Sequence, residues 1–319
     1  MEPPQGRILV IRGGAIGDFI LTLPALAAIR ATFPRTEITV LGYPRIAELA
    51  LLAGVADGLH AIESRGFALF FNPKTGPRLP EAEAAFLAGF DIIISYLYDP
   101  DRFFETNVRR VSKAQYIAGP HRPDEVLTLH ATDTFLKPLE RLAVVDADPV
   151  PRVAVQAGRE RRRGDGRPVV AVHPGSGSVA KNWPEARWAN LLQRLAADTD
   201  CGLLMIAGEA EGDRARKLAA LWPADRLESA VNEPLIEVAA RLAGATVFVG
   251  HDSGITHLAA AVGLPGLALW GPTNREVWHP RGGSIRVLDD PAGLEGIKAD
   301  RVLVELGALL AARKGPQPA

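Results

Sequence analysis

Short apolar runs alternate with polar, glycine-containing turns and longer Ala- and Leu-rich stretches along almost the whole chain. Short apolar runs between turns are typical of buried parallel strands, and the longer stretches are typical of helices. The first half is predicted to have strands at 7–12, 38–41, 58–62 and 91–95 and helices at 19–33, 45–53, 80–88 and 127–142. The second half is predicted to have strands at 169–173, 202–207, 246–249, 267–270 and 285–288 and helices at 183–197, 214–222, 235–242, 255–262 and 300–313.

This alternation predicts an α/β protein with two doubly wound, Rossmann-like domains, at 1–160 and 161–319. The segment 156–168, QAGRERRRGDGRP, is basic, glycine-rich and unpatterned, so it is interpreted as the connection between the domains. The segment 67–80 has little periodicity and is predicted to be a surface loop. The segment 99–110 is a polar stretch that mixes charges with two phenylalanines.

The composition argues against several classes of protein and of binding site. The chain has 319 residues, 47% of them hydrophobic, enough for two cores. Its net charge of −1 gives no reason to expect a nucleic-acid partner, and a lone Cys201 excludes an internal disulfide framework and a cysteine metal cluster. Neither a signal peptide nor an apolar run of the ~18 residues that span a bilayer is recognised. We expect a cytoplasmic protein that meets a membrane, if at all, from its surface.

The stretch from 247 to 278 concentrates polar residues where a predicted strand ends and a helix begins. His251, Asp252, Ser253, Thr256 and His257 fall within seven positions. A helix N-terminus offers unpaired amides and the positive end of a dipole, which suits an anion. Either Asp252 or Ser253 would also serve as an ordinary N-cap. Because a cap needs one such residue, the cluster favours a ligand site.

Two further strand ends in the second half carry candidate ligand-binding residues. The loop 174–181, PGSGSVAK, lets backbone amides approach phosphate oxygens and adds one positive charge, and it is not a Walker A sequence. Its candidates are Ser176, Gly177 and Lys181. Glu209 follows the strand at 202–207, where a carboxylate can accept ribose hydroxyls or simply begin a surface turn.

The first strand is followed by Gly13-Gly14-Ala15-Ile16-Gly17-Asp18. The loop lacks the G-x-G-x-x-G pattern, and no acidic residue closes the second strand, which argues against an NAD site. Asp18 is either a helix N-cap or a general base at the mouth of a cleft. Lys113, His121 and Arg122 form either a basic acceptor pocket or a solvated face.

Four segments resemble glycosyltransferase family 9, the heptosyltransferases of lipopolysaccharide core assembly. They are ILVIRGGAIGDFILTLP (8–24), VHPGSGSVAKNWPEARW (172–188), IAGE (206–209) and VGHDSGITHLAAAVGLPGLALWGP (249–272), in family order. The last is close to the family pattern G-x-D-[ST]-G-x-x-H-L-A-A-A. The resemblance implies a GT-B fold, in which two Rossmann-like domains face a central cleft.

The resemblance also implies an inverting, metal-independent transfer of heptose from an ADP-sugar to a lipopolysaccharide core or related glycan. Asp18 matches the proposed general base, Lys181 supports the leaving group, and Glu209 matches a ribose-contacting position. Lys181, Asp252, Ser253, Gly254 and His257 match donor-site positions, and the predicted donor-binding set is Ser176, Gly177, Lys181, Glu209, Asp252, Ser253, Gly254, Thr256 and His257, with no metal and no cofactor. No D-x-D-like carboxylate pair lies near these loops, which agrees with a metal-free site. A sugar-nucleotide epimerase of similar architecture and a non-catalytic nucleotide-sugar binder stay open.

Overall fold

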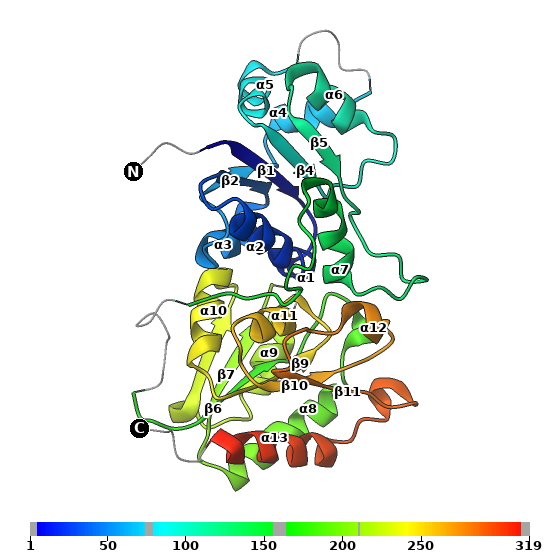
Figure 1. Cartoon of the computed structure of the whole chain (residues 1–319). Helices are drawn as coiled ribbons and strands as arrows, with labels where there is room; N and C mark the ends of the chain where they lie inside the picture. The colour runs from blue at the N-terminus through cyan, green and yellow to red at the C-terminus, as the bar shows by residue number, and fades with distance from the viewer. Residues whose placement is uncertain (1–4, 74–78, 156–163, 210, 314–319) are drawn as a thin grey trace. The chain divides into compact units, whose positions relative to one another are not determined.

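A computed structural model describes residues 5–73, 79–155, 164–209 and 211–313, and these divide into two compact units, Met1–Val150 and Pro151–Ala319 (Figure 1). The sequence placed the boundary at 160–161. The second unit begins earlier because Val153 is already buried and its amide donates to Ala261 O at 2.9 Å. Most of the predicted connection, residues 156–163, lies outside the described residues.

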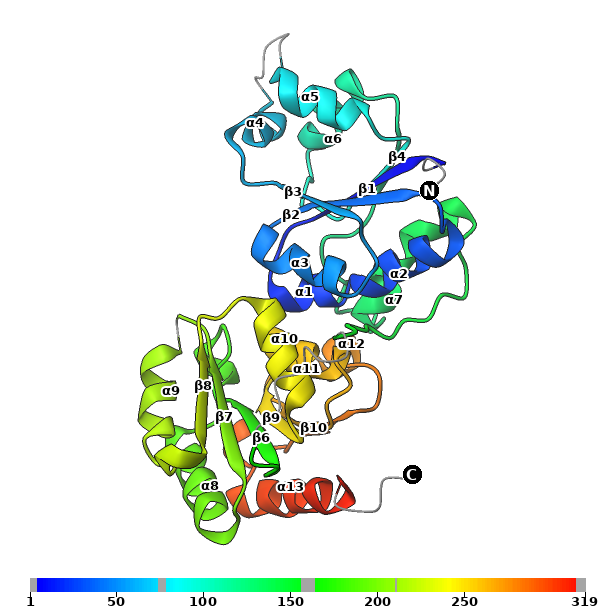
Figure 2. The ribbon, with the colours of Figure 1, turned by 90° about the vertical axis from the view of Figure 1, so that its left-hand side faces the viewer.

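The first unit contains a five-stranded parallel sheet in the order β3-β2-β1-β4-β5. Its strands are β1 (Arg7–Arg12), β2 (Glu37–Gly42), β3 (Gly58–Ala61), β4 (Ile92–Ser95) and β5 (Gln115–Ala118). Its helices are α1 (Ile16–Ile20), α2 (Leu23–Thr32), α3 (Pro44–Leu52), α4 (Arg65–Ala68), α5 (Glu81–Ala88), α6 (Phe103–Val111) and α7 (Ala131–Leu136), with 3-10 turns at Leu69–Phe71 and Lys137–Leu142. Figure 2 shows α4, α5 and α6 on one face and α1, α2, α3 and α7 on the other.

The second unit contains a six-stranded parallel sheet in the order β11-β10-β9-β6-β7-β8. Its strands are β6 (Val169–His173), β7 (Gly202–Ala207), β8 (Leu227–Val231), β9 (Val247–His251), β10 (Gly266–Leu269) and β11 (Ile285–Leu288). Its helices are α8 (Glu185–Asp198), α9 (Gly212–Ala219), α10 (Leu235–Gly244), α11 (Gly254–Ala261), α12 (Arg275–Trp278) and α13 (Ala299–Arg313). Residues of α8, α9 and α13 share one buried cluster with the strands, and α10 and α11 lie on the other face (Figure 2).

Two predictions for the first unit are wrong in detail, and one stretch with no predicted element is helical. The helix predicted at 19–33 is two helices, α1 and α2, and Pro24 lies in the first turn of α2 where its missing amide costs nothing. The loop predicted at 67–80 begins with the last two residues of α4 and a 3-10 turn, and Phe67 and Phe70 are fully buried. The polar stretch 99–110 contains most of α6, whose Phe104 packs into the same aromatic cluster. Residues 74–78 of the predicted loop lie outside the described residues.

Candidate functional site

The order of the second sheet creates a switch point between β6 and β9. These strands are parallel neighbours, with His173 aligned to Gly250, yet the chain leaves β6 towards β7 and leaves β9 towards β10 on the opposite side. In open α/β sheets ligands bind beyond the carboxyl ends of the strands at such a point. The loops that leave here are the two that carry most of the predicted donor residues.

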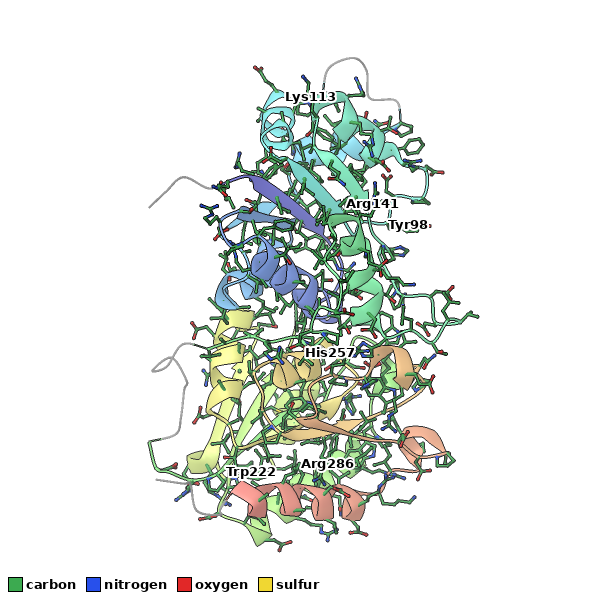
Figure 3. All side chains as sticks on the ribbon, viewed as in Figure 1. Tyr98, Lys113, Arg141, Trp222, His257 and Arg286 are labelled. Atoms are coloured by element: carbon green, nitrogen blue, oxygen red, sulfur yellow. The ribbon has the colours of Figure 1, made fainter. Side chains whose placement is uncertain are left out.

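The start of α11 resolves the choice between Asp252 and Ser253 as the cap. Ser253 is the N-cap, with extended backbone angles, and its Oγ accepts the Thr256 amide at 3.4 Å. The Thr256 hydroxyl donates back to His251 O. The first-turn amides, beginning at Gly254, therefore face outwards from a well-fixed helix start, as an anion site requires. His257, one residue further, is buried on α11 (Figure 3).

Asp252 is free of capping and pairs with Lys181 instead. Lys181 Nζ lies 2.6 Å from Asp252 Oδ2, across the switch point. The aspartate is 8% exposed and the lysine 32% exposed, so the positive charge sits at the solvent side of the pair. The structure therefore brings together two predicted residues that are 71 positions apart.

The loop between β6 and α8 is held by its own side chains. Ser176 Oγ donates to Ser178 O at 2.9 Å and lies 3.1 Å from Asn182 Oδ1, and Ser176 is buried. Gly177 is exposed at the tip of the loop, with open space where a Cβ would lie. Ser176 therefore shapes the loop, and Gly177 leaves its backbone accessible.

The carboxylates after β7 divide into an exposed one and a packed one. Glu209 is exposed on the turn after the strand. Glu211, which sequence reasoning missed, has Oε2 3.1 Å from the Gly208 amide, and its side chain leaves no room for a Cβ at Gly175, with Cγ 2.1 Å from that position. The loop can therefore pass over Glu211 only with glycine at position 175. Nothing in the sequence indicated this contact, because Glu211 is simply a second glutamate two residues after Glu209.

His251 connects the two loops beneath the Lys181–Asp252 pair. It is fully buried at the end of β9, and its Nε2 accepts the Trp183 amide at 2.8 Å. Nδ1 lies 3.4 Å from Gly175 O. Burial, with the nearby His173 and Arg214, lowers the pKa of His251 to about 3, against the weaker opposing effect of the Gly175 carbonyl. His251 is therefore a neutral imidazole near neutral pH.

Asp18 lies in the first unit, where β1 leads into α1. The N-cap of α1 is Ala15, so the N-cap interpretation of Asp18 is wrong in position: Asp18 is the third residue of the helix. Its Oδ2 accepts the Ala15 amide at 3.1 Å, which is a local capping contact, and the side chain is 24% exposed. Gly14 has φ +98°, and a Cβ there would lie 3.1 Å from Asp18 Oδ2. The glycine is required for this close turn.

A buried arginine lies beneath Asp18. The Arg12 guanidinium, at the end of β1, donates to Asp18 O, Tyr96 O and His121 O and stacks 4.5 Å from the Phe135 ring. Its NH2 lies 3.8 Å from Asp18 Oδ1. Burial lowers the pKa of Arg12, and the Asp18 charge opposes this. Arg12 thus fixes the segments that surround Asp18, a role that its place in an apolar strand did not reveal.

The predicted basic acceptor pocket is not assembled as the sequence suggested. Lys113 precedes β5 and His121 follows it, so the two residues lie at opposite ends of that strand. The ring of Tyr98, which is labelled with Lys113 in Figure 3, lies tilted against the His121 ring with 4.6 Å between the ring centroids. Arg122, next to His121, lies 3.6 Å from Glu125. Only His121 and Arg122 remain near the carboxyl edge.

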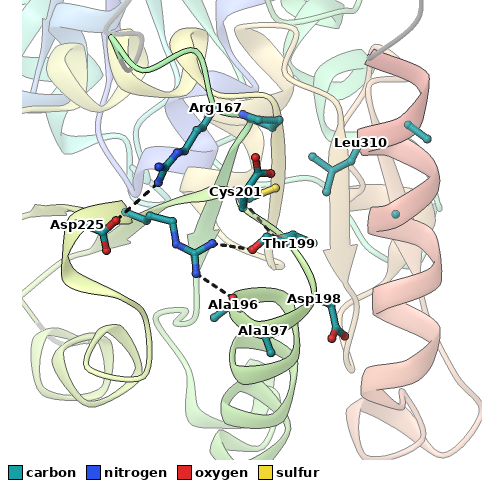
Figure 4. Close-up of a pocket in the computed structure, with 13 residues that line it drawn as sticks. Arg167, Ala196, Ala197, Asp198, Thr199, Cys201, Asp225 and Leu310 are labelled. Atoms are coloured by element: carbon teal, nitrogen blue, oxygen red, sulfur yellow. Dashed lines mark hydrogen bonds and ion pairs between the residues drawn. The ribbon is translucent and has the colours of Figure 1, made fainter.

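A cavity of about 770 Å³ lies at the other edge of the second sheet (Figure 4). Arg226 donates to the carbonyl of Ala196 in the last turn of α8 and to that of Thr199, the C-cap of the helix, and lies 5.7 Å from the Trp222 ring. Cys201 lines the cavity and is buried. Because these are the amino ends of the strands and the arginine caps a helix, we interpret this cavity as part of the scaffold.

The residues that the structure describes include no candidate metal-ligand cluster and no candidate membrane span. No three of their His, Cys, Asp or Glu side chains are grouped to hold a metal ion. Within the same ranges no helix has the length and apolar character of a membrane span.

Comparison with known proteins identifies a family that the chain resembles. The model of glycosyltransferase family 9 (heptosyltransferase) matches residues 139–293, which include the switch-point loops. Over these residues, just under half of its length, the chain is similar to glycosyltransferase family 9. A putative glycosyltransferase of Haemophilus influenzae is 26% identical over 344 aligned residues, covering 95% of this chain and 96% of the relative. The lipopolysaccharide heptosyltransferase 1 of Pseudomonas aeruginosa is 36% identical over 139 residues, 43% of this chain and 33% of its own.

The chain also has the expected fold. The structure of the E. coli ADP-heptose lipopolysaccharide heptosyltransferase II superposes with a TM-score of 0.79 at 17% identity, over 97% of this chain and 100% of that one. The GT-B prediction of two Rossmann-like units is confirmed, and the chain is a glycosyltransferase.

Proposed function

We propose that this family 9 glycosyltransferase moves a heptose from ADP-heptose to a lipopolysaccharide core or related glycan acceptor, with inversion and without a metal ion. The observation that carries the proposal is the Lys181–Asp252 pair at the start of α11, on the switch point of the second sheet. A cation beside a helix N-terminus suits a diphosphate. The choice of heptose as the transferred sugar rests on relatives that are named as heptosyltransferases.

The ADP leaving group gains negative charge as its bond to the sugar breaks. Lys181, amides of the 176–178 loop and the start of α11 stabilise that charge in place of a metal. Gly254 and Thr256 supply the helix turn, with Ser253 as its cap. Glu209, exposed after β7, is the proposed contact to the ribose.

The residue proposed to activate the acceptor, Asp18, belongs to the first unit. Asp18 takes the proton from an acceptor hydroxyl as that oxygen attacks the anomeric carbon, and ADP departs from the opposite side, which inverts the configuration. Arg12 donates a hydrogen bond to Asp18 O, and its NH2 group lies 3.8 Å from Oδ1 of the Asp18 carboxylate. Because a lipopolysaccharide acceptor is anchored in a membrane and the donor is a cytoplasmic nucleotide sugar, we place the reaction at the cytoplasmic face of the inner membrane.

The test is a donor and acceptor assay with the full chain. ADP-heptose is incubated with and without a truncated lipopolysaccharide, ADP release is followed, and the anomeric configuration of the product is read by NMR. We expect ADP release that depends on the acceptor and a product of inverted configuration. Conversion of the sugar without acceptor would instead identify an epimerase, and binding without turnover would identify a non-catalytic nucleotide-sugar binder.

A further inference from the structure

We propose that His251 is a positioning residue of the donor site, whose imidazole closes both ends of the loop that carries Lys181. This inference rests on the proposed function, because it assigns the loop to the donor diphosphate. The His251 imidazole contacts the backbone of Trp183 and Gly175 and not the side chains of the Lys181–Asp252 pair. It acts through the backbone of the loop.

The imidazole joins the two ends of the loop. Nε2 accepts the Trp183 amide at 2.8 Å, and an acceptor nitrogen carries no proton, so the ring proton is on Nδ1. Nδ1 faces Gly175 O at 3.4 Å. One ring therefore contacts the first and the last part of the 175–183 segment, with Lys181 between them.

The ring itself is held in place. His251 has no exposed surface, and the edge of Trp188 packs against it at 5.4 Å with the ring planes at 83°. The Trp183 indole donates to Ile297 O at 3.0 Å, which fixes that end of the loop from the other side. Because His251 is fully buried with both nitrogens engaged, it does not reach a substrate.

His251 also connects the loop to the helix start. Its carbonyl accepts the Thr256 hydroxyl in the first turn of α11, and its chain neighbour Asp252 binds Lys181. The side chain thus holds the loop and the backbone holds the helix. Both parts of the proposed diphosphate site are organised around one residue before any ligand arrives, which lowers the ordering cost of binding.

The test compares three substitutions of His251. His251→Leu fills the space without an acceptor, and in His251→Asn the amide is too short to reach Trp183. In His251→Gln the side-chain oxygen reaches the position of Nε2. We expect the Leu and Asn variants to raise the Kd for ADP and the KM for ADP-heptose roughly tenfold, with a smaller change in kcat, the scale of a lost buried hydrogen bond. His251→Gln should recover most of the loss.

A destabilised control separates positioning from general loss of stability. Leu192→Ala removes a fully buried side chain from the middle of α8 and should lower the Tm while leaving the Kd for ADP unchanged. If Leu192→Ala weakens ADP binding as much as His251→Leu, or if folded His251→Leu and His251→Asn bind ADP like the wild type, the proposal is wrong. If the Leu variant does not fold, the Asn and Gln variants decide between these outcomes.

Hydrogen exchange without ligand distinguishes failure of this inference from failure of the proposed function. We expect faster amide exchange across 175–183 in His251→Asn and wild-type protection in His251→Gln. Unchanged exchange in the Asn variant overturns the role of His251, whatever the donor is. Faster exchange in a protein whose wild type binds no ADP would instead show that the loop is held as described but is not an ADP site, and the inference would fall with the proposed function.

Discussion

Lys181 Nζ and Asp252 Oδ2 are 2.6 Å apart, and this ion pair joins the loop after β6 to the loop after β9. The two strands are neighbours in the sheet, so the pair spans its switch point. An entering diphosphate must therefore share the lysine with Asp252 or replace it. The lysine is already placed for that exchange, because it is the more exposed member of the pair.

Replacing Asp18 by Asn separates the acceptor role from the donor role. The amide oxygen can still accept the Ala15 amide, so α1 should keep its start, but the base is lost. We expect the transfer rate to fall roughly a hundredfold or more, the usual scale for loss of a general base, with an unchanged Kd for ADP. Asp101→Asn, at an exposed position before α6, is the matched control and should transfer normally. A near wild-type rate for Asp18→Asn would place the base elsewhere.

Replacing Gly14 by Ala tests the geometry around Asp18. The backbone has φ +98°, and the new Cβ would lie 3.1 Å from the Asp18 carboxylate, so the carboxylate must shift. We expect a rate loss of roughly tenfold or more, since small misplacements of reacting groups are costly, and an unchanged Kd for ADP. Gly307→Ala in α13, where a Cβ meets open space, should be neutral or slightly stabilising. Equal rates for the two variants would contradict the account.

The stability of the second unit should fall in mild acid because of His251. Its pKa is about 3 in the folded protein and ~6.5 when unfolded, lowered by burial, His173 and Arg214. Between these values only the unfolded chain binds the proton. The contribution is therefore fully present above pH ~6.5 and is lost as pH falls, by up to ~1.4 kcal/mol per unit. The pKa of buried His173 is also lowered, which adds in the same direction.

All five tryptophans lie in the second unit, so their fluorescence reports its unfolding. Urea unfolding between pH 7 and pH 5 should show a smaller loss of stability in His251→Gln than in the wild type. Parallel curves for the two proteins would mean that His251 does not stay neutral in the folded state.

Chelation tests the proposed replacement of a metal by Lys181 and backbone amides. We expect EDTA to leave the transfer rate within about twofold of the untreated enzyme, because the leaving group is stabilised by the protein's own positive charge and amide dipoles. The same assay after adding magnesium or manganese is the control. A rate that collapses in EDTA and returns with either ion would overturn the metal-free mechanism.

The sequence predicted best what local patterns encode. Strands β1, β6, β7 and β11 have the predicted bounds because each is a short apolar run between turns. The edge strand β8 was missed because LESAV mixes charged and apolar residues at a partly solvated edge. β5 was missed because only its two central residues are buried and the exposed Gln115 and Ala118 on either side leave no continuous apolar run.

For the candidate site, too, the sequence predicted the features that local patterns encode and missed those that depend on distant residues. Asp252 and Ser253 were found because both directly follow a strong strand. Which of them caps the helix depended on Lys181, 71 positions away, which takes Asp252 as its partner. The bond between His251 and Trp183 joins residues 68 positions apart, and only the folded sheet brings them together. No local pattern contains that information.

Calorimetric titration of ADP into the wild type, Lys181→Ala and Lys217→Ala tests the central claim most directly. Lys217 is an exposed lysine of α9 in the same unit, so it controls for the loss of one charge. The account predicts saturable ADP binding to the wild type and Lys217→Ala, and a Kd raised roughly tenfold or more in Lys181→Ala, about 1.4 kcal/mol or more of lost binding free energy. Unchanged ADP affinity in Lys181→Ala would contradict it, because the 174–181 loop would then not be the diphosphate site.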